Sequence, residues 1–456
     1  MASLPPAVAV GALYDSLLQS ALRQFFDRAT LDAESTPSVS SDGRLSIEPS
    51  SDPSALTIRW FGTRYTLRVS RRWPFTGHEV RLARSIGAVL AARYRAILTP
   101  RVVAERGDLF RGAIEDRYVG AFIDEQPYRI ETREARADRI ALSIELLRVA
   151  ALSSYESRPI STGVLLLGTN EDPCRPTPPI RASKARFTEQ LTSIKSFYRL
   201  ADGLRTVFLA NADGQLLDII DVDRWAAQAC HGLELVAPCA NSYQAHARAT
   251  LGHGHVCAVL SPSREIKVFA DGAQIFAFRG GAWHLLDIAA KYDLWARAVG
   301  DRDLASRLFQ TALDLSDARE GALFVVLSEP DAAVTQLVAA GDRLDIPVPP
   351  EVKPADGPSR RDLLHLLEGR SATDLDPTVF AALASLDGAT VVDRSGRLLA
   401  AGAILRHPQS VDMDFGGVIE GARTTAAMAA GRFGSVLKVS EDGAITFFDQ
   451  ERVWDI

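Results

Sequence analysis

The residues of this chain that are best suited to chemistry lie in its last third. Asp387 precedes Gly388 at the junction between a predicted helix, which ends there, and a strand predicted over 390–392. A carboxylate at the edge of a strand, next to a glycine, can hold a hard cation such as Mg²⁺. On spacing alone, an aspartate that only closes a turn is the commoner explanation. Asp387 is therefore a candidate metal ligand, with a purely structural role as the alternative.

A second candidate is the segment Gly421-Ala422-Arg423-Thr424-Thr425, which follows an acidic loop over 407–414 and opens a helix predicted over 426–430. Backbone N–H groups at the start of a helix can bind a phosphate together with hydroxyl groups and an arginine. Glycine-threonine openings are common, so the segment alone is a weak signal. The hairpin that follows carries Ser440-Glu441 at its turn. Glu441 is either a second metal-facing carboxylate or an exposed turn acid.

Local signals predict the elements that must position these residues. Asp376 followed by Pro377 is a favoured helix start, and apolar residues then recur at helical spacing until Asp387. A strand over 397–405 follows the first one. Asp387 thus stands at a helix-to-strand junction, and Arg423 stands at the start of a later helix.

An internal repeat gives the organisation of the chain. Residues 257–269 align with residues 436–448 at a constant offset, which places Ser261 on Ser440. Further upstream, Asp202-Gly203 parallels Asp387-Gly388, and a third pair of matching segments precedes both. Because these landmarks occur in the same order, the sequence predicts two tandem copies of one α/β domain, over 157–300 and 301–456.

Residues 1–156 have a different pattern. Helices are predicted over 7–29, 79–98 and 135–154, two strands over 56–60 and 65–69, and a loop or linker over 34–54. The arginines of the second helix are expected to form a solvated face, with an anion site as the alternative: Arg81, Arg84, Arg93 and Arg95. The predicted fold class is therefore α/β, with mixed β-sheets flanked by helices, in two tandem copies after an N-terminal α+β region. We expect that region to be sensory or regulatory.

Composition excludes several classes of protein. The 51 lysines and arginines are outnumbered by 57 aspartates and glutamates, for a formal charge of −6, whereas broad nucleic-acid binding needs a basic surface. No stretch approaches 18 uncharged apolar residues, so no membrane span is expected. The N-terminus has no basic region typical of a secretory signal, and the four cysteines form no CxxC pair. We expect a cytoplasmic protein with reduced cysteines.

The C-terminal copy resembles the diadenylate cyclase (DAC) family, the catalytic domain of bacterial cyclic di-AMP synthases. The resemblance rests on residues 320–326, on Asp387-Gly388-Ala389, which is similar to the family's DGA motif, on Gly421-Ala422-Arg423, and on residues 439–441. The segment over 395–405 continues the family pattern. The resemblance implies that two ATP-loaded domains meet face to face. Each ribose 3′-hydroxyl then attacks the α-phosphate of the other nucleotide and expels pyrophosphate.

The resemblance also implies a role for each matching residue. Asp387 would bind Mg²⁺ or Mn²⁺ and help to activate the 3′-hydroxyl. Arg423 would contact phosphates, and Glu441 would be a second metal ligand. The other implied nucleotide-binding residues are Gly388, Ala389, Leu405, Gly421, Thr424, Thr425 and Ser440. Because the reaction needs two competent sites, the resemblance implies a homodimer or larger assembly formed through residues 301–456.

This chain departs from the family pattern at one important place. The family has Arg-His-Arg where this sequence has Arg423-Thr424-Thr425, and Ala422 replaces a threonine. Losing an arginine that meets transition-state charge costs on the order of 10³–10⁵ in rate. Arg432 or the N-terminal arginines are candidate replacements. The alternative function is an inactive sensor that binds ATP or cyclic di-AMP. The first copy departs further, with Leu204 after Asp202-Gly203 and residues 242–246 in place of the phosphate loop, so we expect it not to turn over ATP.

Overall fold

The computed structural model describes the chain except for residues 1–5, 27–28, 36–44, 70, 72, 98, 100, 102–106, 126–127, 129–137, 156, 170–183, 195, 230–232, 345–362 and 407–420. Contacts divide the chain into two compact units. The first combines Met1–Val236 with Ala245–Asp287, and the second combines Ala237–Gln244 with Ile288–Ile456. The predicted division at residues 156 and 300 stays a prediction. Among the described helices, none is long and apolar enough to cross a membrane.

The N-terminal part of the first unit contains an antiparallel four-stranded sheet in the order β1-β4-β3-β2. Its strands are β1 (Thr30–Ser35), β2 (Ser46–Pro49), β3 (Ala55–Trp60) and β4 (Thr63–Arg68). Among the described residues, it is accompanied by the helices α1 (Pro6–Phe25), α2 (Gly77–Ile97), α4 (Ile114–Ile123) and α5 (Arg139–Ala151). The hairpin predicted from the alternating strands is present, because Phe61 and Gly62 both have positive φ and form a tight turn. The loop predicted over 34–54 is wrong in part, since β2 lies within it and pairs with β3.

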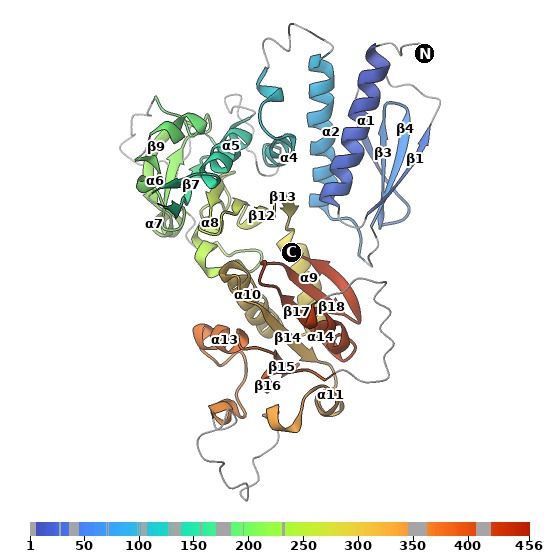
Figure 1. Ribbon diagram of the computed structural model, residues 1–456, viewed down its shortest axis with the longest axis vertical. Coiled ribbons are helices and arrows are strands. Elements are labelled where there is room, and N and C mark those ends of the chain that lie inside the picture. Colours follow the sequence, from blue (N-terminus) through green and yellow to red (C-terminus); the bar gives the residue numbers. More distant parts are fainter. Residues whose placement is uncertain are drawn as a thin grey trace, which may run out of the picture. The chain divides into compact units, whose positions relative to one another are not determined.

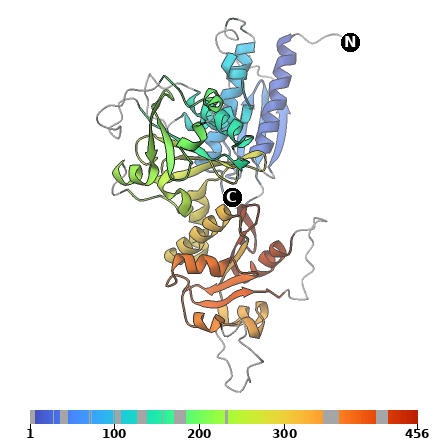
Figure 2. The ribbon, with the colours of Figure 1, turned by 60° about the vertical axis from the view of Figure 1, so that its left-hand side comes forward.

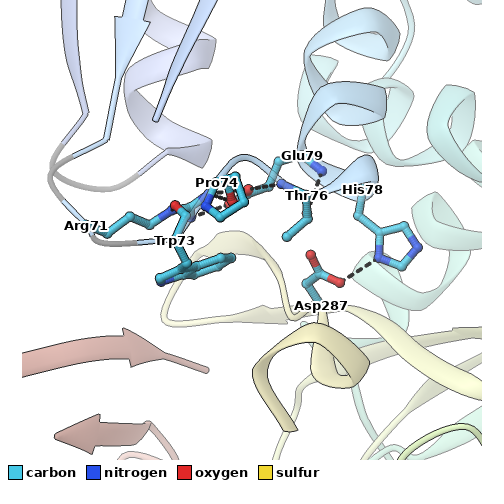
Figure 3. Close-up of polar contacts among 7 residues, drawn as sticks. All are labelled: Arg71, Trp73, Pro74, Thr76, His78, Glu79 and Asp287. Atoms are coloured by element: carbon cyan, nitrogen blue, oxygen red, sulfur yellow. Dashed lines mark hydrogen bonds and ion pairs between the residues drawn. The ribbon is translucent and has the colours of Figure 1, made fainter. Parts of the chain in front are cut away.

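Two polar contacts hold the first turn of α2 (Figure 3). The guanidinium of Arg71 donates to both carboxylate oxygens of Glu79, at 2.6 and 2.5 Å, and lies 3.5 Å from the ring centroid of Trp73. His78 Nδ1 lies 2.8 Å from Oδ1 of Asp287, the last residue of the first unit. The helix begins here because the N–H of Thr76 donates to Oε2 of Glu79 at 2.8 Å and the N–H of Glu79 donates to the Thr76 hydroxyl at 3.2 Å, a reciprocal cap.

The arginines farther along α2 divide into two groups. Arg84 and Arg95 are exposed, as a solvated face predicts. Arg81 and Arg93 are only partly exposed, because their guanidinium groups lie over aromatic rings. For Arg81, the ring of Tyr128 is 5.0 Å away. Two of the four arginines therefore belong to packing against other elements.

A seven-stranded sheet in the order β13-β12-β11-β10-β7-β8-β9 follows in the first unit. Its strands are β7 (Thr162–Leu166), β8 (Thr206–Ala210), β9 (Leu216–Asp221), β10 (Val256–Leu260), β11 (Ile266–Ala270), β12 (Ala273–Arg279) and β13 (Ala282–Leu285). Short helices α6 (Phe197–Leu200), α7 (Val222–Ala229) and α8 (Gln244–Arg248) connect them, and β5 (Ser154–Tyr155) and β6 (Arg158–Pro159) form a separate small hairpin.

The second unit contains a six-stranded sheet in the order β16-β15-β14-β17-β18-β19. Its strands are β14 (Ala322–Leu327), β15 (Ala389–Asp393), β16 (Leu398–Ala403), β17 (Gly434–Val439), β18 (Ile445–Asp449) and β19 (Glu451–Asp455). Its helices are α9 (Ile288–Val299), α10 (Arg302–Ala318), α11 (Pro330–Leu337), α13 (Pro377–Ala384) and α14 (Ala422–Ala430). Asp376 caps α13 as expected, because its carboxylate accepts a hydrogen bond from the N–H of Thr378 at 2.8 Å.

The two larger sheets repeat one another. Each has a single parallel pair, β7 with β8 and β14 with β15, and is otherwise antiparallel in the same order. The turns match as well: the N–H of Ser261 donates to the Glu265 carbonyl, and the N–H of Ser440 donates to the Ala444 carbonyl. At the other end, Asn211 and Asp393 each accept N–H groups two and four residues ahead. The predicted α/β fold class, with two tandem copies, is confirmed.

Both faces of the C-terminal sheet are covered by helices. Leu323, Val325 and Leu327 point to one face and cluster with apolar residues of α11 and α14. Phe324 points to the other face, where its ring lies 6.1 Å from that of Phe380 in α13. Figures 1 and 2 show the strands between these helices. The sheet is therefore buried on both sides, and its strand ends are the places where polar side chains can gather.

Candidate functional site

Three predicted site residues meet at one end of the C-terminal sheet, where β14 begins and β17 ends. Nη1 of Arg423, in the first turn of α14, lies 3.1 Å from Oε1 of Glu441. Nη2 of the same side chain lies 3.9 Å from Oδ1 of Asp387. Glu441 is at the turn after β17, and Asp387 is just before β15. One guanidinium thus lies within ion-pair distance of two carboxylates that come from different elements.

Gly321 makes room for this guanidinium. The residue immediately precedes β14, and a Cβ atom there would overlap the end of the Arg423 side chain. Arg423 is about one-third exposed, whereas the carboxylates of Asp387 and Glu441 are 97% and 73% exposed. The arginine is thus held against the protein while both acids face solvent, where they can reach a ligand.

Gly388 fixes the backbone next to Asp387. Its φ of +113° is a conformation that side-chain-bearing residues rarely adopt. A Cβ on this glycine would lie 2.5 Å from the carbonyl carbon of Gly402 and 2.7 Å from the carbonyl oxygen of Ala403, both in β16. Ala389, which follows, is buried and pairs with Ala403. A glycine is therefore required where Asp387 leaves the sheet.

The start of α14 is ordered by its own backbone. The carbonyl of Gly421 accepts hydrogen bonds from the N–H groups of Thr424 and Thr425, at 2.9 and 3.2 Å. These two N–H groups are therefore used inside the helix. The amides of Ala422 and Arg423, in the first helical turn, precede this ladder of bonds. Fewer backbone N–H groups are therefore left for a phosphate than the sequence suggested.

Sequence reasoning missed Lys438. Its Nζ donates to Oγ1 of Thr424 at 2.9 Å, which brings an ammonium group to the start of α14. The available signal was a lysine inside strand β17, whose other residues are all buried. A pocket of about 250 Å³ opens beside this contact. It is lined by Gly421, Thr424, Lys438, Thr446, Phe448 and Arg452.

The remaining predicted residues have structural surroundings. Leu405 is 6% exposed and belongs to the apolar cluster between the sheet and α11. Ser440 forms the β17–β18 turn. Its N–H donates a hydrogen bond to the Ala444 carbonyl, and its own carbonyl accepts one from the N–H of Gly443. Their contacts to a nucleotide stay predictions. The predicted acidic loop over 407–414 lies outside the described residues.

Arg432 does not replace the missing basic residues. It precedes β17, whereas Glu441 follows that strand, so the two lie at opposite ends of it. Arg432 instead lines a separate pocket of about 410 Å³ with Ser328, Glu329 and Asp449. The structure therefore contradicts this suggested substitute.

Asp387 and Glu441 have the chemistry of ligands in a nucleotide-dependent cation site, and their binding of a cation stays a prediction. Mg²⁺ is commonly held by one or two carboxylates, with phosphates and water completing its shell. Asp387 and Glu441 supply two exposed carboxylates joined through Arg423. Over the described part of the chain, no group of three His, Cys, Asp or Glu residues gathers to form a fuller cage. A cation here would depend on a phosphate ligand for the rest of its coordination.

The corresponding place in the first copy is filled by its own side chains. Nε2 of His246 lies 3.0 Å from the carbonyl oxygen of Gly203, and burial lowers the pKa of this histidine to about 4. The carboxylate of Asp202 accepts the N–H groups of the three residues that follow Gly203. Lys267 pairs with Glu265 at 3.6 Å. His246, Asp202 and Lys267 are therefore each engaged within the first copy.

Comparisons with known proteins add little to this geometry. No protein-family model and no curated protein sequence matches the chain. A crystal structure of DacA from Staphylococcus aureus, in a double-mutant form, is similar to it at 19% sequence identity. The match covers 33% of this chain and 87% of that one, with a TM-score of 0.20. A likeness at that level supports no functional assignment, and fold similarity does not by itself imply function.

Proposed function

We propose that the C-terminal unit is a diadenylate cyclase, which condenses two ATP molecules into cyclic di-AMP and releases two pyrophosphates. The observation that carries the proposal is the meeting of Asp387, Arg423 and Glu441 at one end of the sheet. These residues are far apart in the sequence, and each matches a motif that the DAC resemblance assigns to metal or phosphate contact.

The chemistry follows from these groups. The oxygen of one ribose 3′-hydroxyl bonds to the α-phosphorus of the other ATP, and the bond to the β-phosphate breaks. Pyrophosphate leaves with the bonding electrons, and the hydroxyl proton passes to solvent. A second, reciprocal transfer closes the ring. A bound Mg²⁺ or Mn²⁺ ion would supply charge neutralisation of the phosphates. Asp387 and Glu441 would hold that ion, and Arg423 would turn from them to the phosphates.

The reaction needs two facing sites, and this determines the assembly that we propose. The counterpart of the site in the first copy is filled by His246 and by the turn around Asp202. The second site must therefore come from another copy of the chain. Activity per molecule should fall when the protein is diluted below the concentration at which the homodimer forms. Constant activity across such a dilution would contradict this part of the proposal.

A second function has one specific observation in its favour. The resemblance places a histidine and an arginine after Arg423, but here Thr424 accepts a hydrogen bond from Lys438 instead. A site without those two groups can bind a nucleotide without turning it over. The chain would then be a sensor of ATP or cyclic di-AMP.

One experiment separates these functions. Purified full-length protein is incubated with ATP and Mg²⁺ or Mn²⁺, and cyclic di-AMP is measured by mass spectrometry. Asp387→Asn should abolish product, whereas Asp449→Asn, at the opposite end of the sheet, should leave product formation unchanged. Saturable binding of ATP or cyclic di-AMP without product would instead favour the sensor. Absence of both product and binding would contradict both functions.

A further inference from the structure

The pocket beside the start of α14 combines two cations and two hydroxyl groups. It lies among α14, β17, β18 and β19, and Lys438, Arg452, Thr424 and Thr446 face it from these four elements. Phe448 supplies an apolar wall. Ammonium, guanidinium and hydroxyl groups are donors, and together they suit a ligand that is negatively charged and rich in oxygen acceptors.

Lys438 occupies a position where a lysine is costly. It pairs with Leu323 of β14 and Thr446 of β18 in the interior of the sheet, between the buried residues Leu437 and Val439. Holding a lysine side chain in one orientation costs rotamer freedom, because that side chain has four rotatable bonds. Its ammonium group is nonetheless directed to the first turn of α14, 2.9 Å from the Thr424 hydroxyl.

Arg423 is not among the residues that line this pocket, so its contact to a phosphate would lie outside it. Its guanidinium contacts the carboxylates of Glu441 and Asp387. Arg452, in contrast, lines the pocket, although it also pairs with Asp455. Of the two cationic side chains that line the pocket, Lys438 is the one directed to the start of α14, and it is the main cationic contact expected for an anion bound here.

The size of the pocket limits the ligand. Sites for whole small molecules are typically about 300–1,000 Å³, whereas this pocket is about 250 Å³. It therefore suits a phosphate chain rather than a complete nucleotide. The pocket and the Asp387–Arg423–Glu441 group share the first turn of α14, which supplies Thr424 to the pocket and Arg423 to the carboxylates.

We propose that this pocket binds the β- and γ-phosphates of the nucleotide and that Lys438 supplies the positive charge for them. The inference rests on the proposed function for the identity of the nucleotide. In this arrangement Lys438, from β17, takes the place of the basic groups that the sequence lacks after Arg423. Thr424 positions the lysine and can itself donate a hydrogen bond to a phosphate oxygen.

The test is calorimetric titration of the full-length protein with tripolyphosphate, ATP and AMP. Lys438→Met keeps much of the aliphatic chain and removes the charge, so it should weaken tripolyphosphate and ATP binding by roughly tenfold or more, since hydrogen bonds to charged groups are among the stronger ones. AMP binding should be unchanged, because AMP lacks the two outer phosphates. Lys438→Arg should restore most of the affinity. Arg432→Gln, in the separate pocket beside Ser328 and Asp449, is the matched control and should behave as the wild type.

Unchanged tripolyphosphate affinity in Lys438→Met would overturn the inference, and so would an equal loss for AMP and ATP. No measurable tripolyphosphate binding by the wild type would overturn it as well. If Lys438→Met does not fold, the variant Arg452→Gln, at an exposed residue, provides the test. It should weaken tripolyphosphate binding severalfold, and an unchanged affinity would overturn the inference. Lys438-dependent ATP binding without cyclic di-AMP would support the pocket and contradict the cyclase. Equal cyclase activity in wild type and Lys438→Met would contradict the pocket alone.

Discussion

Replacing Gly388 with alanine should loosen the strand pair that carries the candidate site. The φ of +113° is strained for alanine, and such strain costs about 1–3 kcal/mol. The new Cβ would also lie 2.5–2.7 Å from backbone atoms of Gly402 and Ala403, which have no flexible side chain to move aside. The backbone of β15 and β16 must therefore separate. We expect a total cost of about 3 kcal/mol in the free energy of opening this pair.

Hydrogen exchange measured by mass spectrometry on the full-length protein tests this expectation. Peptides that cover 389–393 and 398–403 should exchange roughly a hundredfold faster in Gly388→Ala. A loss of about 3 kcal/mol in the opening free energy raises the equilibrium constant for local opening by about two powers of ten. The matched control is Gly341→Ala in the same unit, where no atom lies within 4 Å of the added Cβ. Wild-type protection of β15 and β16 in Gly388→Ala would refute the steric reasoning.

Two further predictions concern single side chains. Gly321→Ala should push the Arg423 guanidinium away while leaving thermal stability nearly unchanged, because the added Cβ meets the end of a flexible side chain. ATP affinity measured by calorimetry should fall severalfold. An unchanged ATP affinity would contradict the proposed phosphate contact of Arg423. His246 has a folded pKa of about 4, below its ordinary 6.5, because it is buried. The unfolded chain therefore binds this proton first, so stability is fully present above pH 6.5 and falls by up to about 3 kcal/mol as the pH drops to 4. Urea unfolding of His246→Gln between these pH values should show a correspondingly smaller loss than the wild type.

Much of the fold could be predicted because it depends on local patterns. Alternating residues predicted the β3–β4 hairpin, and the repeated landmarks predicted two similar sheets. The helix α4 was missed because two of its charged residues are buried. Asp116 accepts a hydrogen bond from Nε1 of Trp283 at 2.8 Å and one from Arg148, and such distant partners leave no local signal in the sequence.

The candidate site could be predicted only where motifs mark it. Asp387, Arg423 and Glu441 stand at turns and a helix start, where polar residues attract notice, and the structure brings them together. Lys438 could not be placed in the same way. The direction of its side chain depends on the packing of α14 against β17, which the spacing of residues along either element does not specify.

The pairing of β14 has a consequence for the synthesis of the chain. This central strand joins β15 on one side and β17 on the other, and Ala322 pairs with Val439. Residues 322–327 leave the ribosome long before residues 434–439 do. Until β17 arrives, one side of a wholly apolar strand is an unpaired edge that can join other nascent chains. The C-terminal unit should therefore fold only after release of β17, and it should depend on chaperones during translation more than the N-terminal hairpins do.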